Sequence, residues 1–209
     1  MDIRRDFYLE KLIKRKSNGL IKVITGIRRC GKSYLLNNIF YHHLLDSGVE
    51  ADHIIRFAFD SADDLYLIGE RLIQIEKEKR GVDPEKFMAY IRSKTTGEGI
   101  YYLLLDEIQM LDCFEAVLNG YLRKENIDVF VTGSNAKLLS KDIATEFAGR
   151  GDEIHMYPLS FAEFMSVYNG DKYTGLSEYM LYGGIPLVVL RDGAVDKATA
   201  LQNLFNEIY

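Results

Sequence analysis

Short apolar runs alternate along the chain with segments of helical periodicity. Five runs predict strands, at residues 20–25, 53–59, 100–105, 127–132 and 152–157. The third run is apolar at every position, which is typical of a strand buried on both faces of a parallel sheet. Because helices are predicted between the strands, the pattern indicates an α/β fold around a central parallel sheet.

Capping residues and periodicity place the helices. A single amphipathic helix is predicted after the cap-like run 61–64, with one apolar face formed by Leu65, Ile68, Leu72 and Ile75. Other helices are predicted at residues 84–91, 112–124, 137–148 and from 160 onward. Residues 4–16 read as a basic helix, whose cations we interpret as a solvated face, with a phosphate or nucleic-acid contact as the alternative.

Composition narrows the class of protein. The 209 residues, 47% of them apolar, suffice for one α/β domain, alone or with a small appendage. A net charge of −5 gives no global reason to expect nucleic-acid binding. The two cysteines and four histidines show no disulfide or metal-ligand spacing, which suits a reducing cytosol. No apolar run approaches transmembrane length and no signal-peptide core follows Met1, so we expect a cytoplasmic protein without a membrane partner.

The strongest chemical signal directly follows the first predicted strand. Residues 26–33 fit the phosphate-binding P-loop pattern G-x-x-x-x-G-K-[ST]. Its two glycines let main-chain N–H groups close around phosphate oxygens, and the next helix directs its N-terminal amides at them. Lys32 can reach the β- and γ-phosphates, and the Ser33 hydroxyl can bind Mg²⁺. The predicted nucleotide-binding residues are Gly26, Ile27, Arg28, Arg29, Cys30, Gly31, Lys32, Ser33 and Tyr34.

An acidic pair supplies the second half of this site. The apolar run 100–105 ends in Asp106, the position from which P-loop NTPases hold hydrated Mg²⁺. Glu107 is then placed to polarise a water for in-line attack on the γ-phosphate. Because many strands end in acidic turns, Asp106 and Glu107 alone are a weak indication of a metal site. Together with the P-loop they become a strong one. We predict Ser33 and Asp106 as metal ligands and Lys32 and Glu107 as catalytic residues.

A polar turn follows the fourth predicted strand. Ser134 or Asn135 would lie beside the strand of Asp106 and could hydrogen-bond the γ-phosphate or the attacking water; the alternative is a plain strand-to-helix turn. A GTPase is expected to read Asn-Lys-x-Asp here, whereas residues 135–138 read Asn-Ala-Lys-Leu. ATP is therefore expected rather than GTP. No Ser/His/Asp or Cys/His set suits a hydrolase of another type.

Together these motifs resemble those of AAA+-related P-loop ATPases, and more closely the bacterial and archaeal ATPases grouped with the STAND and archaeal-ATPase lineages. The matching runs are residues 25–33, 103–109, 131–135, 149–151, 158–164 and 183–186. The resemblance implies an AAA+/ASCE-like three-layer sandwich with an extra strand between the P-loop strand and the strand of Asp106. It also implies that Ser134 (or Asn135) is the sensor and that Arg150 is a candidate arginine finger, acting either in its own chain or on a neighbouring subunit of a homo-oligomer. The alternative for Arg150 is a cap on the C-terminus of the preceding helix.

The resemblance also suggests the domain organisation. Residues 1–160 would form the ATPase core with its N-terminal helix, and residues 161–209 a small helical segment. Members of the group usually carry a further C-terminal domain. Because residues 201–209 look helical without a stop signal, we expect the native chain to continue past Tyr209.

The sequence therefore predicts a Mg²⁺-dependent ATPase whose hydrolysis of ATP is coupled to a conformational change. Two other functions stay open: a nucleotide-dependent switch or scaffold with incidental turnover, and a P-loop kinase. Cys30 lies near the helix N-terminus, Arg29 and Lys32, so its thiol is expected to be either reactive and protected by ATP, or packed and inert.

Overall fold

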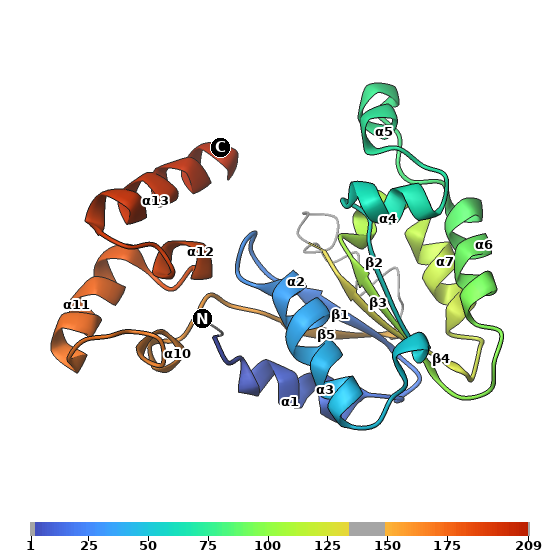
Figure 1. Cartoon of the computed structure of the whole chain (residues 1–209), viewed down its shortest axis with the longest axis horizontal. Coiled ribbons are helices and arrows are strands. Elements are labelled where there is room, and N and C mark those ends of the chain that lie inside the picture. The colour runs from blue at the N-terminus through green and yellow to red at the C-terminus, as the bar shows by residue number, and fades with distance from the viewer. Residues whose placement is uncertain (1–2, 134–148, 209) are drawn as a thin grey trace. The chain divides into compact units, whose positions relative to one another are not determined.

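Five parallel strands form the central sheet (Figure 1). The computed structural model describes residues 3–133 and 149–208, and its strands are β1 (Ile21–Thr25), β2 (Ile54–Ala58), β3 (Tyr101–Asp106), β4 (Ile127–Thr132) and β5 (Gly151–His155). They pair in the order β2-β3-β4-β1-β5, and all four pairings are parallel. All five predicted strands are confirmed. β4 separates β1 from β3, as the resemblance implied.

Helices cover both faces of this sheet. One face carries α4 (Ala62–Leu67), α5 (Leu72–Glu78), α6 (Pro84–Lys94) and α7 (Phe114–Tyr121), and residues such as Phe87, Leu103 and Leu118 share one buried apolar cluster there. Because successive side chains of a strand point to opposite faces, Phe130 points away from this cluster. It packs against Phe40 on the other face, with ring centroids 4.6 Å apart.

Phe40 belongs to a helical run that begins inside the P-loop motif. This run consists of α2 (Lys32–Tyr34), a π-helical section (Leu35–Phe40) and α3 (Tyr41–Asp46). Before β1, α1 (Asp6–Arg15) buries Tyr8 and Leu12, and the predicted helix over residues 4–16 is confirmed apart from its ends.

The predicted continuous helix through Leu65 and Ile75 is wrong. The chain forms two helices, α4 and α5, which are separated by Gly69 with φ of +72° and by the buried residue Glu70. The Glu70 carboxylate accepts hydrogen bonds from Arg80 Nη2 and Lys86 Nζ, each at 2.6 Å. Burying a carboxylate without such partners would be energetically costly, and the break between α4 and α5 allows Glu70 to reach both cations.

Capping predictions have mixed outcomes. Ser61 and Ser160 both cap their helices, and Ser160 forms the predicted capping box with Glu163. The capping box predicted at Asp112 is wrong: α7 begins at Phe114, and its N-cap is Cys113, in a left-handed conformation without a side-chain cap. The predicted helix at residues 137–148 lies outside the described residues.

The chain divides into two compact units, which are described separately. The sheet unit consists of residues 7–26 and 32–155, and the helical unit of residues 1–6, 27–31 and 156–209. The helical unit contains α10 (Phe161–Met165), α11 (Lys172–Tyr182), α12 (Pro186–Val189) and α13 (Ala194–Ile208). The predicted boundary at residue 160 stays a prediction. In the part of the chain that the structure describes, no helix has the length and apolar character needed to cross a membrane.

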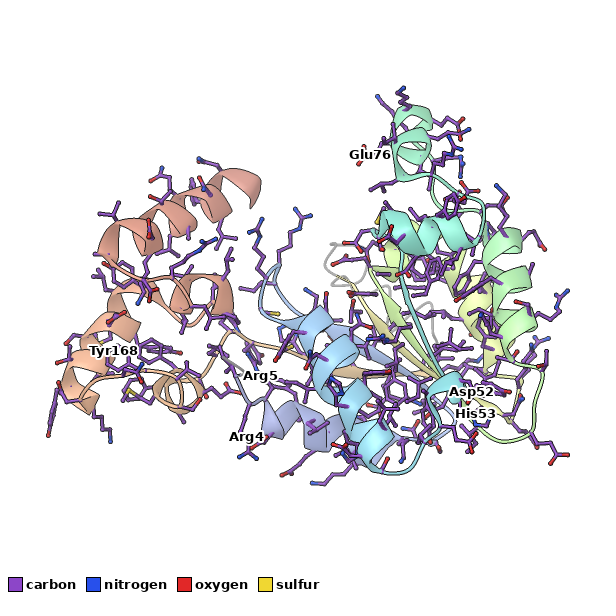
Figure 2. All side chains as sticks on the ribbon, in the orientation of Figure 1. Arg4, Arg5, Asp52, His53, Glu76 and Tyr168 are labelled. Atoms are coloured by element: carbon purple, nitrogen blue, oxygen red, sulfur yellow. The ribbon has the colours of Figure 1, made fainter. Side chains whose placement is uncertain are left out.

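The basic segment at residues 4–16 is not simply a solvated face. Arg5, which is labelled in Figure 2, is buried in the helical unit. It pairs with Glu163 at 3.1 Å and donates to the Tyr157 carbonyl at 2.6 Å. In the sheet unit, Arg15 pairs with Asp152 at 2.6 Å. Exposed pairs also form, between Lys14 and Glu10 and between Arg4 and Asp6. Four of the six basic residues of this segment therefore pair with a carboxylate of the chain. The alternative of a phosphate or nucleic-acid contact stays a prediction.

Candidate nucleotide-binding site

The predicted site residues of the sheet unit gather where the strands end. β1 runs into Gly26, β3 ends at Asp106 and β4 ends at Thr132. The register pairs Ile24 with Thr132 and Leu105 with Val131, so these carboxyl ends lie at one edge of the sheet. Ligands of open parallel sheets bind at this edge.

Asp106 lies at the centre of a hydrogen-bonded cluster. Its Oδ1 accepts from the Ser33 hydroxyl at 3.0 Å and from the Thr132 hydroxyl, and its Oδ2 accepts from Asn37 Nδ2 at 3.2 Å. The two predicted metal ligands are thus in direct contact. A carboxylate and a hydroxyl beside a phosphate-binding loop are oxygen donors that suit Mg²⁺, which takes few protein ligands and completes its shell with phosphate and water.

Negative charge is concentrated around this cluster. Burial raises the pKa of Asp106 above its usual value, and the Glu107 and Asp60 carboxylates raise it further, although hydrogen bonds from Thr132 and Ser33 oppose the shift. Burial also raises the pKa of Asp60. Partly desolvated carboxylates that repel one another favour a divalent cation, because the cation offsets both costs.

Glu107 has an unusual backbone conformation. Its φ of +52° lies in the left-handed region, which costs a non-glycine residue about 1–2 kcal/mol. Its N–H donates to Thr132 Oγ1 at 3.2 Å, and Gln109 Nε2 donates to its carboxylate. Thr132 therefore bridges the two acidic residues, donating to Asp106 and accepting from Glu107. Strain of this kind is concentrated at functional sites.

The phosphate-binding loop has the expected backbone. Gly26 and Gly31 have φ of +141° and +101°, and Arg29 between them has φ of +63°. Gly31 requires glycine for this reason, since a side chain there would be strained. Lys32 is buried, and its Nζ donates to the Gly26 carbonyl at 3.0 Å. Cys30 is also buried, and this burial favours the packed, inert thiol over the reactive one.

Arg150 lies apart from the other predicted site residues. The predicted sensor residues, Ser134 and Asn135, are outside the described residues. Arg150 precedes β5, its carbonyl accepts from Ile21 N–H at 2.9 Å, and its Nη1 donates to Asn119 Oδ1 at 3.3 Å. Ile21 begins β1, so Arg150 lies at the amino edge of the sheet, a strand length of about 16 Å from the loop that follows β1. Arg150 is thus separated from Asp106 and Glu107 of its own chain.

Sequence reasoning missed Thr132, Asn37 and Gln109. Thr132 directly precedes the turn that contains the predicted sensor, and Asn37 follows Ser33 by one helical turn. Their closeness in sequence to predicted site residues could therefore have indicated them. Gln109 lies two residues beyond Glu107, in a turn of 3₁₀-helix (Ile108–Met110). None of the three belongs to the P-loop pattern, and only the folded chain brings them to the acidic pair.

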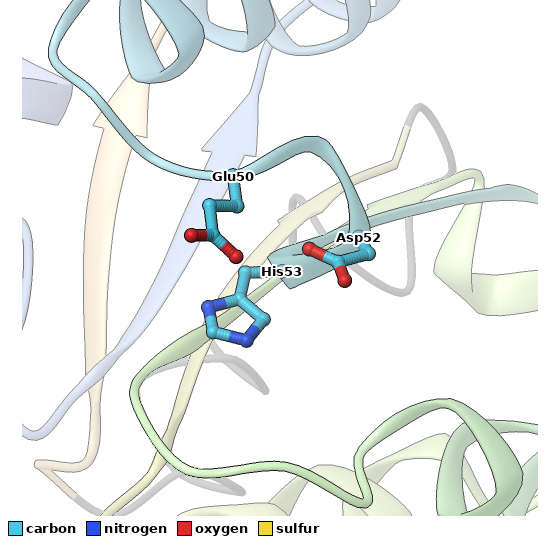
Figure 3. Close-up of side chains that lie close together, drawn as sticks. All are labelled: Glu50, Asp52 and His53. Atoms are coloured by element: carbon cyan, nitrogen blue, oxygen red, sulfur yellow. The ribbon is translucent and has the colours of Figure 1, made fainter.

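The four histidines have no metal-ligand spacing in the sequence, so structural or surface positions are expected for them. Ligand atoms of His53, Glu50 and Asp52 lie within 4.8 Å of one another at the amino end of β2 (Figure 3). The two carboxylates are exposed, and the imidazole packs on Tyr101 with ring centroids 4.4 Å apart. Exposed acidic groups are often this close without an ion, and ring packing accounts for His53. The cluster therefore gives no reason to change the interpretation.

Comparison with known proteins identifies the family. Residues 18–165 match the model of a family described as AAA domain. The chain belongs to this AAA domain family. Two curated relatives align with 99% of this chain. One is an uncharacterized protein of Haemophilus influenzae, 37% identical over 213 residues, and the other is an uncharacterized protein of Methanocaldococcus jannaschii, 30% identical over 225 residues. The chain spans 49% and 44% of their lengths, about half of each relative.

Solved structures agree with the AAA+ fold. AMPPCP-bound DnaA from Aquifex aeolicus has a TM-score of 0.53 at 13% identity, covering 94% of this chain and 58% of that protein. The Aeropyrum pernix ORC1 protein in complex with DNA has a TM-score of 0.51 at 15% identity, covering 100% and 60%. At this identity the likeness concerns the fold alone. Family and fold together place this AAA domain among the AAA+ P-loop ATPases.

Proposed function

We propose that this AAA domain binds ATP with Mg²⁺ and hydrolyses it, and that turnover is coupled to a conformational change. The observation that carries the proposal is the contact of Ser33 and Thr132 with Asp106, where Ser33 is next in sequence to Lys32 and Asp106 to Glu107. A phosphate-binding loop, a hydroxyl–carboxylate pair and a second carboxylate are the parts that phosphoryl transfer to water needs.

Each residue has a definite role in this proposal. Main-chain N–H groups of residues 26–33 bind the phosphate oxygens, and Lys32 leaves the Gly26 carbonyl to neutralise the β- and γ-phosphates. Ser33 and Asp106 hold Mg²⁺, which supplies charge neutralisation at the phosphates. Glu107 accepts the proton of the attacking water, with its carboxylate oriented by Gln109.

The remaining predicted positions complete the proposal. Ser134 or Asn135 would sense the γ-phosphate at the end of β4. Arg150, separated from its own site, would stabilise the transferring phosphoryl group of a neighbouring subunit, because a permanently charged guanidinium suits those oxygens. A switch or scaffold would use the same binding residues without needing fast turnover, and a kinase would transfer the phosphoryl group to an acceptor other than water.

Glu107→Gln tests the catalytic part of the proposal. The amide keeps the shape of the side chain but cannot accept the proton, so phosphate release should fall by about 100-fold or more while Mg·ATP still binds. Glu125→Gln changes an exposed glutamate elsewhere and should leave turnover unchanged. Turnover at the wild-type rate in Glu107→Gln would contradict the assigned role.

Ligand-dependent stability tests the binding part separately. Mg·ATP at about a hundred times its Kd should stabilise the wild type by about 2.7 kcal/mol, and Lys32→Ala should lose most of this shift. Stabilisation without phosphate release would favour the switch. Phosphate transfer that depends on an added acceptor would favour the kinase, and an unchanged melting curve would count against all three functions.

A further inference from the structure

The outer edge of β2 forms the floor of a groove. β2 is the end strand of the sheet, with β3 on one side and no described strand on the other (Figure 1). A groove of about 560 Å³ follows this edge within the sheet unit. It is lined by the strand itself, by Asn37, and by three residues of α6, namely Tyr90, Ser93 and Lys94. Ala51, Asp52 and Asp64, which flank the strand in the sequence, complete the lining.

The backbone of β2 is open to this groove at its centre. The N–H of Phe59 donates to the Asp106 carbonyl at 3.1 Å, so every second residue before it, Phe57 and Ile55, also faces β3. Ile54, Arg56 and Ala58 then direct their N–H and C=O groups into the groove.

Three of the four backbone groups at the two ends of this exposed edge are already hydrogen-bonded. The Ile54 N–H donates to the Ala51 carbonyl. The Ala58 N–H donates to Asp64 Oδ2 at 2.9 Å, and the Ala58 carbonyl accepts from the Ser61 N–H at 3.1 Å. Within the described ranges 3–133 and 149–208, no group bonds to the N–H or the C=O of Arg56. The open edge is therefore centred on one residue.

The Arg56 side chain is held beside these backbone groups. Its guanidinium lies over the Tyr41 ring, 4.0 Å from the centroid, and Nη1 donates to the Asn37 carbonyl at 3.3 Å. The side chain is exposed, and the guanidinium has five N–H donors. Most of its donors are left to bind a carboxylate, whose planar geometry matches the guanidinium fork.

We propose that the β2 edge binds an extended segment of a partner protein, in antiparallel orientation, with an aspartate or glutamate opposite Arg56. In a hydrogen-bonded antiparallel pair, one residue exchanges both N–H···O bonds with its opposite residue and shares its face of the sheet. One acidic residue can thus satisfy the N–H, the C=O and the guanidinium of Arg56 together. Flanking side chains point to the other face, where Tyr90 and Lys94 lie.

Charge argues against a second copy of this chain as the occupant. Antiparallel pairing of two β2 strands about their centres would place Arg56 opposite Arg56, and like charges directly opposite are destabilising. Lys94 adds positive charge to the same groove. Its two carboxylates belong to the ends of β2: Asp52 precedes the strand, and Asp64 is already bound to the Ala58 N–H. The centre of the groove therefore complements an acidic segment.

Backbone amide NMR of the ¹⁵N-labelled 209-residue chain tests this proposal. The probe is a blocked peptide, Thr-Val-Thr-Glu-Thr-Val-Thr, with a matched peptide that has lysine in place of glutamate. The glutamate peptide should shift the Arg56 amide resonance saturably at about 1 mM or below, and the lysine peptide should bind about tenfold more weakly or not at all. The test requires no nucleotide.

Charge reversal supplies the decisive control. Arg56→Glu should exchange the preference, so that the lysine peptide binds more tightly, while Arg92→Ala, an exposed change on α6 outside the groove, should leave it unchanged. If Arg56→Glu does not fold, Arg56→Gln should lose the preference for glutamate. The proposal would be overturned by the absence of a saturable shift, by equal binding of both peptides, or by dimerisation through β2. If no shift occurs, the role left for Arg56 is to prevent unwanted pairing at the edge strand.

Discussion

Lys22 and Asp128 form an ion pair buried between two neighbouring strands. Lys22, on β1, is fully buried and lies over the Phe130 ring, 4.6 Å from the centroid. Burial lowers the pKa of Lys22, an effect that Asp128 opposes. Asp128 also accepts the Ser17 N–H at 2.8 Å. Both charges are thus satisfied, and each depends on the other.

Removing one member of this pair should be costly. Lys22→Met keeps much of the side-chain volume but leaves Asp128 as a buried charge without its cation, so we expect a loss of about 3–5 kcal/mol in the free energy of unfolding. Urea unfolding measures it. Lys14→Met breaks an exposed pair with Glu10 and should cost no more than about 0.5 kcal/mol. Equal losses in the two variants would contradict the role given to burial.

Asp106 makes the stability of the nucleotide-free protein depend on pH. The pKa of Asp106 is raised in the folded state. Its contribution to the free energy of unfolding is therefore fully present below the pKa of the unfolded chain, about 3.9, and is lost as pH rises through the folded-state pKa. Asp106→Asn does not titrate. The unfolding free energy of the variant minus that of the wild type should therefore increase from about pH 4 to about pH 7. Thermal unfolding at several pH values checks the sign, and a constant or decreasing difference would refute it.

At the scale of elements, the break between α4 and α5 depends on Gly69. Its φ is +72°, and a Cβ there would meet no atom within 4 Å, so Gly69→Ala should lose about 1 kcal/mol through backbone strain alone. Gly120, inside α7, has equally open surroundings but no positive φ. Gly120→Ala should therefore gain about 0.5–1 kcal/mol. Opposite signs in urea unfolding are expected, and a gain in both variants would mean that the break does not need a left-handed residue.

At the scale of the whole molecule, Arg150 connects the proposed chemistry to assembly. Because it lies at the amino edge of its own sheet, its proposed target is the site of another subunit. Lys32→Ala and Arg150→Ala proteins should each be inactive, whereas their mixture should regain some phosphate release, since one interface can pair an intact loop with an intact arginine. Arg123→Ala, an exposed change on the same unit, should keep full activity alone. No recovery in a mixture shown to co-assemble would remove the trans role.

The sequence by itself was enough to predict the five strands, the P-loop at residues 26–33 and the acidic pair Asp106–Glu107. Runs such as residues 100–105 are apolar throughout, and the P-loop pattern depends on residues adjacent in the chain, so both signals are local. Family resemblance supplied the position of β4 between β1 and β3. The sensor residues Ser134 and Asn135 stay predictions.

Only the tertiary structure decided the features that depend on distant residues. Periodicity continued from Leu65 to Ile75 because these side chains enter one core, yet the helix breaks where Glu70 must reach Arg80 and Lys86. Thr132 reaches Asp106 only because β3 and β4 are neighbours in register. A local pattern determines which residues are apolar, but pairing across the sheet determines which polar groups meet, and that depends on the folded chain.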